Sequence, residues 1–354
     1  MTNPARRILR RRKTEKGVYT QMSTKLTLLE VLNENTNIYL SGQELADRLG
    51  ISRNSVWKAM KKLQEQGYII ESKAGTGYRL REQTDIVTAD YLKEHVAHPC
   101  RYQILDVTDS TNRVARELDV SDCRDQPYII VANEQTKGRG RLGRNFYSPP
   151  GTGLYITIAF CPDFGLDKAM LVTTIAAVAV CRAIEQVTGL YPKIKWVNDI
   201  YLNGKKVSGM MTEAQSNFET GNIDKIILGI GVNCFPGSFP EELSDIATYL
   251  QNPPKQFSRG QLAAAIVNQF FDAIQQKDTS ALIREYKAKS FILGERITIY
   301  NTISGKSPDR NTKGIKARAI DIDENGGLVV EYLEGRRMRE METLTTGEVS
   351  IRPW

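Results

Sequence analysis

A short glycine- and arginine-rich segment, residues 137–144, carries the residue types best suited to holding an anion. It reads Lys-Gly-Arg-Gly-Arg-Leu-Gly-Arg, with four cations and three glycines. Glycine lets the backbone approach a ligand closely, and the planar donor forks of arginine match phosphate and carboxylate oxygens. Strand-like apolar runs flank the segment at 128–133 and 153–160. We interpret it as a loop that closes over an anion, the alternative being a solvated basic loop or a nucleic-acid-binding tail.

Further polar residues fall where predicted strands end. Ser110-Thr111-Asn112 lies between a strand at 102–107 and a helix at 113–118, where it could cap the helix or bind a polar ligand group. Residues 195–202 read as a strand that reaches the hairpin signal Asn203-Gly204 and returns as 206–213. A buried strand at 226–232 then ends at Asn233. Together with a long helix at 168–188, these segments predict an α+β domain whose mixed or antiparallel sheet carries flanking helices.

The N-terminal region has the spacing of a winged helix-turn-helix. Helix-like runs at 26–32, 45–49 and 53–66 precede two short strands within 68–80, and Ser41 and Ser52 stand where N-caps belong. Such domains place the second helix of the motif in the major groove of DNA. The candidate contacts to bases or phosphates are Arg53, Asn54, Ser55, Trp57 and Lys58. The alternative is a helical module for protein contacts, which the basic and polar surface of the helix disfavours.

Length and composition bound the possibilities further. A chain of 354 residues, 41% apolar and 25% charged, predicts two or three soluble domains. Five scattered cysteines and two histidines argue against a disulfide framework, a zinc site or a histidine triad. No segment approaches the ~20 apolar residues of a membrane span, so we expect a cytoplasmic protein. Most of the net charge of +7 lies in residues 1–21, a basic tail that could lie on DNA phosphates or be dispensable.

Five motifs occur in the order and spacing of biotin protein ligases, namely residues 110–112, 135–144, 195–199, 206–209 and 229–233. With the winged helix, the chain resembles the bifunctional bacterial biotin protein ligase and biotin operon repressor over about residues 24–354. The resemblance implies a central domain like that of class II aminoacyl-tRNA synthetases and a C-terminal SH3-like barrel. Short strands at 296–300, 315–321, 328–332, 336–340 and 348–351 agree with such a barrel. The expected domains are 1–21 (tail), 22–82 (winged helix), 83–288 (catalytic) and 289–354 (barrel).

The resemblance implies a two-step reaction in which biotin and ATP form biotinyl-5'-adenylate and an acceptor lysine then takes the biotin. It implies Arg141 and Lys206 as catalytic residues. The implied biotin site comprises Ser110, Thr111, Asn112, Gln135, Arg139, Gly140, Arg141 and Lys206. The implied nucleotide site comprises Phe146, Asn198, Asp199, Asn233 and Arg352, with magnesium entering with ATP, near Asp199. The implied partners are a biotin carboxyl carrier protein, operator DNA and a second copy of the chain in a ligand-induced dimer, with no membrane.

Three positions depart from the family pattern. Phe146 stands where tryptophan is common, Val197 where proline is common and Leu142 where arginine is frequent. Phenylalanine can still stack, although it has a smaller face and no N–H donor. Two other functions stay open: a biotin-sensing repressor with little or no ligase activity, and a ligase for lipoate or another carboxylic acid. Ligation assays and a comparison of biotin with lipoate in thermal-shift experiments separate them.

Overall fold

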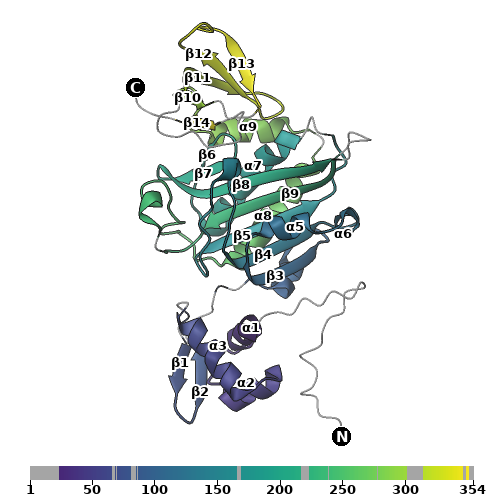
Figure 1. Ribbon diagram of the computed structural model, residues 1–354, viewed down its shortest axis with the longest axis vertical. Coiled ribbons are helices and arrows are strands. Elements are labelled where there is room, and N and C mark those ends of the chain that lie inside the picture. The colour runs from purple at the N-terminus through teal and green to yellow at the C-terminus, as the bar shows by residue number, and fades with distance from the viewer. Residues whose placement is uncertain are drawn as a thin grey trace.

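The described part of the chain forms three units in sequence order. The computed structural model describes residues 24–65, 68, 70–80, 85, 87–165, 169–216, 223–237, 239–276, 278–300, 314–345 and 348–350. The basic tail at 1–21 lies outside these residues. Figure 1 shows the three units one above another, with the N-terminal unit lowest and the C-terminal strands at the top.

The N-terminal unit confirms the predicted winged helix-turn-helix. It comprises α1 (Thr24–Glu34), α2 (Gly42–Leu49), α3 (Arg53–Glu65) and the antiparallel wing strands β1 (Ile70–Lys73) and β2 (Gly77–Leu80). Both predicted caps form, because Ser41 accepts a hydrogen bond from the Glu44 amide and Ser52 accepts one from the Ser55 amide. Gly50 ends α2 in the left-handed conformation that glycine favours, with φ 66°.

The central unit is built on a seven-stranded mixed sheet in the order β3-β4-β5-β9-β8-β7-β6. Only β3 and β4 are parallel to each other, and the other neighbours are antiparallel. The strands are β3 (Arg101–Thr108), β4 (Tyr128–Gln135), β5 (Gly153–Phe160), β6 (Lys193–Lys195), β7 (Asp199–Leu202), β8 (Lys205–Ser216) and β9 (Ile223–Asn233). The helices are α4 (Ala89–His95), α5 (Thr111–Arg116), α6 (Val120–Arg124), α7 (Ala169–Thr188), α8 (Arg259–Ile274) and α9 (Ser280–Lys289), with short 3₁₀ turns η2 (Arg141–Gly143) and η4 (Glu241–Leu243).

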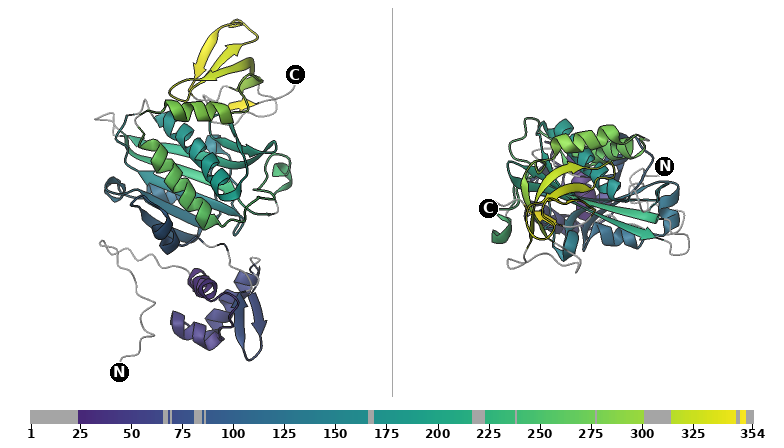
Figure 2. Two further views of the ribbon diagram at one scale, coloured as in Figure 1. Left: turned by 180° about the vertical axis from the view of Figure 1, so that it is seen from behind. Right: turned by 90° about the horizontal axis from the view of Figure 1, so that it is seen from above.

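The two faces of this sheet have different cover, which determines where a ligand can enter. The long helices α7 and α8 lie across one face, as the view from behind shows (Figure 2). Side chains alternate between the faces, so Leu228 and Ile230 of β9 enter the large core under these helices. Ile227, one residue out of phase, packs instead with α5 and α6 in a smaller cluster on the other face. That second face is left partly open for a site.

Two expectations about the central unit are corrected. Residues 195–202 do not form one strand: β6 and β7 pair antiparallel around a turn at Trp196–Asn198, with Lys195 opposite Asp199. The turn is stable because Asn198 exchanges hydrogen bonds with Met210 and Tyr286 donates to the Val197 carbonyl. The expectation that no segment has the composition of a membrane span also fails, since Met170–Thr188 in α7 is long and apolar enough. It is a core helix, with 72% of its apolar window buried.

The C-terminal strands form a separate five-stranded antiparallel sheet in the order β13-β12-β11-β10-β14. They are β10 (Arg296–Tyr300), β11 (Ile315–Ile322), β12 (Leu328–Tyr332), β13 (Met341–Leu344) and β14 (Glu348–Ser350). The strand expected at 336–340 is wrong: these residues turn, with Arg337 bound to Glu340 and Glu342, and the strand begins at Met341. The sheet is compatible with an SH3-like barrel, and the Trp196 indole donates to the Gly326 carbonyl across the junction, at 2.9 Å.

Candidate active site

A cavity of about 140 Å³ opens on the less covered face of the central sheet. Its walls come from the start of α5, the end of β4, the loop around η2, the turn before β7, and strands β8 and β9. The predicted site residues that line it are Ser110, Thr111, Asn112, Gln135, Arg139, Gly140, Arg141, Phe146, Asn198, Asp199 and Lys206. Segments from residue 110 to residue 231 thus meet in one cavity.

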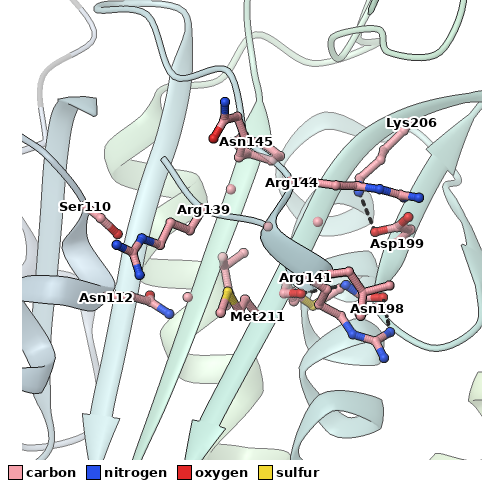
Figure 3. Close-up of a pocket in the computed structure, with 18 of the residues that line it drawn as sticks. Ser110, Asn112, Arg139, Arg141, Arg144, Asn145, Asn198, Asp199, Lys206 and Met211 are labelled. Carbon is pink, nitrogen blue, oxygen red and sulfur yellow. Dashed lines mark hydrogen bonds and ion pairs between the residues drawn. The ribbon is translucent and has the colours of Figure 1, made fainter. Parts of the chain in front are cut away.

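One end of the cavity, called the neutral end for its uncharged hydroxyl and amide groups, is rich in hydrogen-bonding groups and also holds the Arg139 guanidinium. Ser110, Asn112 and Arg139 lie at this end in Figure 3, and Ser110, Thr111 and Asn112 are all buried. Gln135 accepts hydrogen bonds from the Thr111 amide, at 2.8 Å, and from its hydroxyl, at 3.0 Å. Although Ser110 is the N-cap of α5, its side chain makes no capping hydrogen bond. The capping alternative for this serine is therefore not what the structure shows.

The other end of the cavity carries charge. Figure 3 shows Lys206, Asp199, Asn198 and Arg141 here, separated from the neutral end by Met211. The Lys206 ammonium lies 2.6 Å from the Asp199 carboxylate, and the Arg141 guanidinium donates to the Asn198 amide oxygen at 3.1 Å. The hairpin signal is confirmed, since β7 and β8 pair around Asn203-Gly204, both with positive φ. That hairpin places Lys206 opposite Tyr201 and brings Lys206 to Asp199.

The glycine- and arginine-rich segment forms a compact loop at the cavity. The Gly140 amide donates to the Arg144 carbonyl at 2.8 Å, and the Arg144 amide donates back to Arg141 at 3.2 Å. Leu142 has φ 57° and Gly143 φ 71°, so the turn needs the left-handed conformation twice. Leucine pays about 1 kcal/mol or more for this conformation. The loop is where the sequence predicts it, and it is closed by its own backbone bonds.

Glycines in the strands make room for side chains that line the cavity. A Cβ on Gly229 would lie 2.1 Å from the Asn112 Oδ1 atom, and one on Gly231 would lie 2.5 Å from the Phe146 ring. A Cβ on Gly209 would lie 2.9 Å from the Lys206 ammonium. No side chain larger than hydrogen fits these positions without displacing a cavity residue, which gives the glycine motifs a physical reason.

Two predicted nucleotide residues are not brought into the cavity by the described structure. Asn233 does not line it, and its side-chain amide donates to the Thr248 carbonyl at 3.0 Å. Arg352 lies outside the described residues. Their roles remain predictions.

The sequence reading also missed a buried connection behind the neutral end. Glu213, the last residue of the predicted strand 206–213, accepts hydrogen bonds from the Asn112 amide at 2.8 Å and from the Arg116 guanidinium at 2.6 Å. Thr157, a polar residue in the apolar run 153–160, donates to Asn112 at 2.7 Å. Alternation along the predicted strand 206–213 places Glu213 on the same face as Gly209 and Met211, but it does not indicate which residues Glu213 binds.

The five candidate DNA contacts share the exposed side of α3. Arg53, Asn54, Ser55, Trp57 and Lys58 are exposed, while Val56, Met60 and Leu63 are buried in the core of the N-terminal unit. Trp57, with 52% of its surface accessible, is a large exposed apolar side chain on a basic helix. The surface has the mixed basic and aromatic character that nucleic-acid contacts use.

Comparisons with known proteins agree with all three units. Residues 104–233 match the Biotin/lipoate A/B protein ligase family, 24–79 match an HTH domain and 307–352 match the Biotin protein ligase C terminal domain. The bifunctional ligase/repressor BirA of Bacillus subtilis is 33% identical, covering 87% of this chain and 94% of that protein. The Escherichia coli protein of the same name is 26% identical, covering 83% and 91%. The biotin protein ligase of Aquifex aeolicus, solved with biotin and ATP, has a TM-score of 0.57 at 28% identity, covering 71% of this chain and 98% of that one.

The fold and the cavity thus define a ligase of the biotin and lipoate class that carries its own DNA-binding domain. The chain belongs to the family of bifunctional biotin ligases and repressors.

Proposed function

We propose that this protein activates biotin with ATP, transfers it to a lysine of a biotin carboxyl carrier protein, and represses biotin genes when the adenylate accumulates. In the first step a carboxylate oxygen of biotin attacks the α-phosphorus of ATP and pyrophosphate leaves. In the second step the amine of the acceptor lysine attacks the acyl carbon of biotinyl-5'-adenylate and AMP leaves. The observation that carries the proposal is a single cavity with a neutral hydrogen-bonding end and a cationic end.

The neutral end suits the ureido ring of biotin. A ureido group has one acceptor oxygen and two N–H donors, and Ser110, Thr111, Asn112 and Gln135 offer both kinds of partner. Met211 lies between the two ends, where it offers an apolar side chain to the ligand's ring and chain.

The charged end suits the meeting of a carboxylate with a phosphate. Two anions repel each other, so positioned cations must offset their charge for the reaction to proceed. Lys206 and Arg141 are the groups that do this, and Phe146 offers a ring for the adenine or ribose. Among the described residues no group of three possible metal ligands exists. Magnesium would enter as its complex with ATP, and Asp199 would be the cavity carboxylate available to hold it.

The regulatory half follows from the winged helix. One such domain reads few base pairs, so we infer a homodimer on a two-fold operator. A ligand promotes that dimer only if it stabilises the dimer-competent state more than the other state, and further ordering of the loop at 137–144 by adenylate supplies such a difference. We expect this protein in the cytoplasm, where acceptor and operator are present.

Incubation of the full chain with biotin, magnesium-ATP and a biotin carboxyl carrier domain tests the enzymatic half. We expect intact-mass spectrometry to show one biotinyl group on the acceptor, and none on an acceptor whose target lysine is replaced by arginine. Binding of biotin without transfer would instead favour a sensor, and preferential transfer of lipoate would favour the related ligase. The regulatory half requires DNA binding that strengthens when biotin and ATP are added together.

A further inference from the structure

A hydrogen-bonded chain runs behind the neutral end of the cavity, from Arg116 through Glu213 to Asn112. We propose that Glu213 is a positioning residue: it fixes the orientation of the Asn112 amide and thereby sets the affinity for a cyclic urea such as the ureido ring. The inference rests on the proposed function, and its test separates the two.

The two ends of the Asn112 amide are held by different partners. Its Nδ2 atom donates to Glu213 Oε1 at 2.8 Å, and its Oδ1 atom accepts from the Thr157 hydroxyl at 2.7 Å. An ionised carboxylate can only accept hydrogen bonds. Glu213 can therefore bind the NH₂ group of the Asn112 amide but not its oxygen. Each end of Asn112 consequently has a fixed direction, and the cavity presents a fixed pattern of donors and acceptors.

Arg116 binds the Glu213 carboxylate in this half-buried place. Its guanidinium binds both carboxylate oxygens, at 2.6 and 3.0 Å, in the bidentate geometry that makes such pairs strong. Because Arg116 and Asn112 both lie on α5, Glu213 on β8 holds one face of that helix through two side chains.

The position of α5 itself has a second support, so the role of Glu213 is local. Lys225 of β9 is fully buried and donates to the Ala115 and Leu118 carbonyls at the end of α5, at 2.9 and 2.5 Å. Ala115 is also packed in the cluster beneath the helix. Replacing Glu213 should therefore leave α5 in place and free only the amide of Asn112 and the guanidinium of Arg116.

The orientation of the Asn112 amide also affects other residues at the neutral end, because hydrogen bonds connect them. The Thr157 hydroxyl also contacts the Thr111 hydroxyl at 2.7 Å, and Thr111 donates to Gln135. Gln135 in turn donates to Ser148 at 3.1 Å. Inverting Asn112 would place its NH₂ group against Thr157 and so disturb this chain, whereas the cationic end of the cavity has its own partners.

The decisive variant is Glu213→Gln, measured by isothermal titration of biotin into the full chain without ATP. Glutamine keeps the size of the side chain but can meet either end of the Asn112 amide. We expect the Kd for biotin to rise about tenfold, equivalent to ~1.4 kcal/mol, and the KM for biotin to rise with it while kcat changes much less. Glu213→Asp keeps the charge and should recover part of the loss.

A matched control exists on the far face of the sheet. Glu285 binds Arg182 at 2.5 Å with two carboxylate oxygens engaged, and its exposure resembles that of Glu213, at 27% against 22%. Glu285→Gln breaks a comparable ion pair and should leave the Kd for biotin unchanged. An equal loss in both variants would assign the effect to general destabilisation and overturn the proposal.

A double-mutant cycle tests whether Glu213 acts through Asn112. If it does, Glu213→Gln should have little further effect on the Kd once Asn112 is replaced by alanine. Additive losses, or an unchanged Kd in Glu213→Gln alone, would refute the positioning role while leaving the proposed function intact. If the unaltered protein binds no biotin, the proposed function itself fails.

Discussion

At the scale of single residues, the pair formed by Lys206 and Asp199 determines how charge is placed in the cavity. Both side chains are about a quarter exposed, and their charged atoms are 2.6 Å apart. An incoming carboxylate or phosphate competes with Asp199 for the same ammonium, which is compact enough to shift between oxygens. We therefore propose that Lys206 contributes to the reaction through its charge more than through its shape.

Replacing Lys206 with methionine removes that charge and keeps most of the side-chain volume. We expect the rate of pyrophosphate release with biotin and ATP to fall about 10²- to 10³-fold, the usual effect of losing one preorganised group that stabilises developing charge. Lys205→Met is the control, because Lys205 faces out and donates to the Ser244 carbonyl. Equal losses of rate in the two variants would show that the charge of Lys206 has no specific role in the reaction.

Single residues also show where sequence reasoning stops. The glycine–arginine loop, Lys206 and Gln135 were predictable because their types carry unusual chemistry in a recognisable order. Glu213 was not, because its partners Asn112 and Arg116 are about a hundred residues away in the chain. A contact of that kind depends on tertiary packing, which spacing along the chain does not encode.

At the scale of elements, we expect β9 to contribute to both the biotin and the nucleotide parts of the cavity, which it lines with two glycines. Gly229 and Gly231 are two residues apart and therefore lie on the same face of the strand. The first makes room for Asn112 and the second for Phe146. A methyl group at each position should consequently affect a different ligand.

Gly229→Ala and Gly231→Ala test this division. The added Cβ would lie 2.1 Å from Asn112 in the first variant and 2.5 Å from Phe146 in the second, so one neighbour must move in each. We expect steady-state kinetics to show a KM for biotin raised about tenfold or more by the first change and a KM for ATP raised mainly by the second. Gly42→Ala, whose Cβ would be 3.6 Å from its nearest neighbour, should alter neither. Parallel changes in both constants would contradict the division.

The elements were predictable where local signals act alone. The winged helix, strand β5 and the Asn203-Gly204 hairpin follow from caps, apolar runs and turn residues. The turn at 196–198 did not, because its apolar residues resemble a strand and its backbone groups are satisfied by Met210 and Tyr286 from other elements. The turn at 336–340 depends in the same way on Arg337 and its acidic partners.

At the scale of the whole molecule, a buried arginine ties the linker before the central unit to the sheet. Arg259 at the start of α8 is only 4% exposed and binds Asp85 through its backbone and side chain. It also donates to Asn133 and to the Gly153 carbonyl, at 3.1 Å each. Burial raises the pKa of Tyr68, and the nearby Arg259 guanidinium offsets part of that increase. Tyr68 follows the third helix of the winged unit, so this cluster joins the units.

Asp85→Asn should destabilise the protein because it leaves the buried Arg259 guanidinium without its counter-charge. Breaking a buried ion pair on one side costs ~3–5 kcal/mol. Urea denaturation followed by tryptophan fluorescence measures this loss in the free energy of unfolding, because Trp196 is buried in the central unit. Glu340→Gln breaks an exposed pair with Arg337 and should cost less than ~1 kcal/mol. A loss from Asp85→Asn as small as this control would show that the cluster does not hold the units together.

The contact between the DNA-binding and central units should also respond to pH. Burial, together with the negative charges of Asp90 on α4 and Glu34, raises the pKa of Glu30 on α1 to about 7. The folded protein therefore binds a proton at Glu30 that the unfolded chain, with its ordinary carboxyl pKa, releases at lower pH. The free energy of unfolding should fall as pH rises from about 4.5 through about 7, because the folded state holds more protons across this window. Thermal unfolding between pH ~5 and ~8 should show this decline, and it should be weaker in Glu30→Gln, which keeps the volume and cannot ionise. Identical pH profiles for the two proteins would mean that Glu30 stays ionised in the folded state and that the junction does not sense pH.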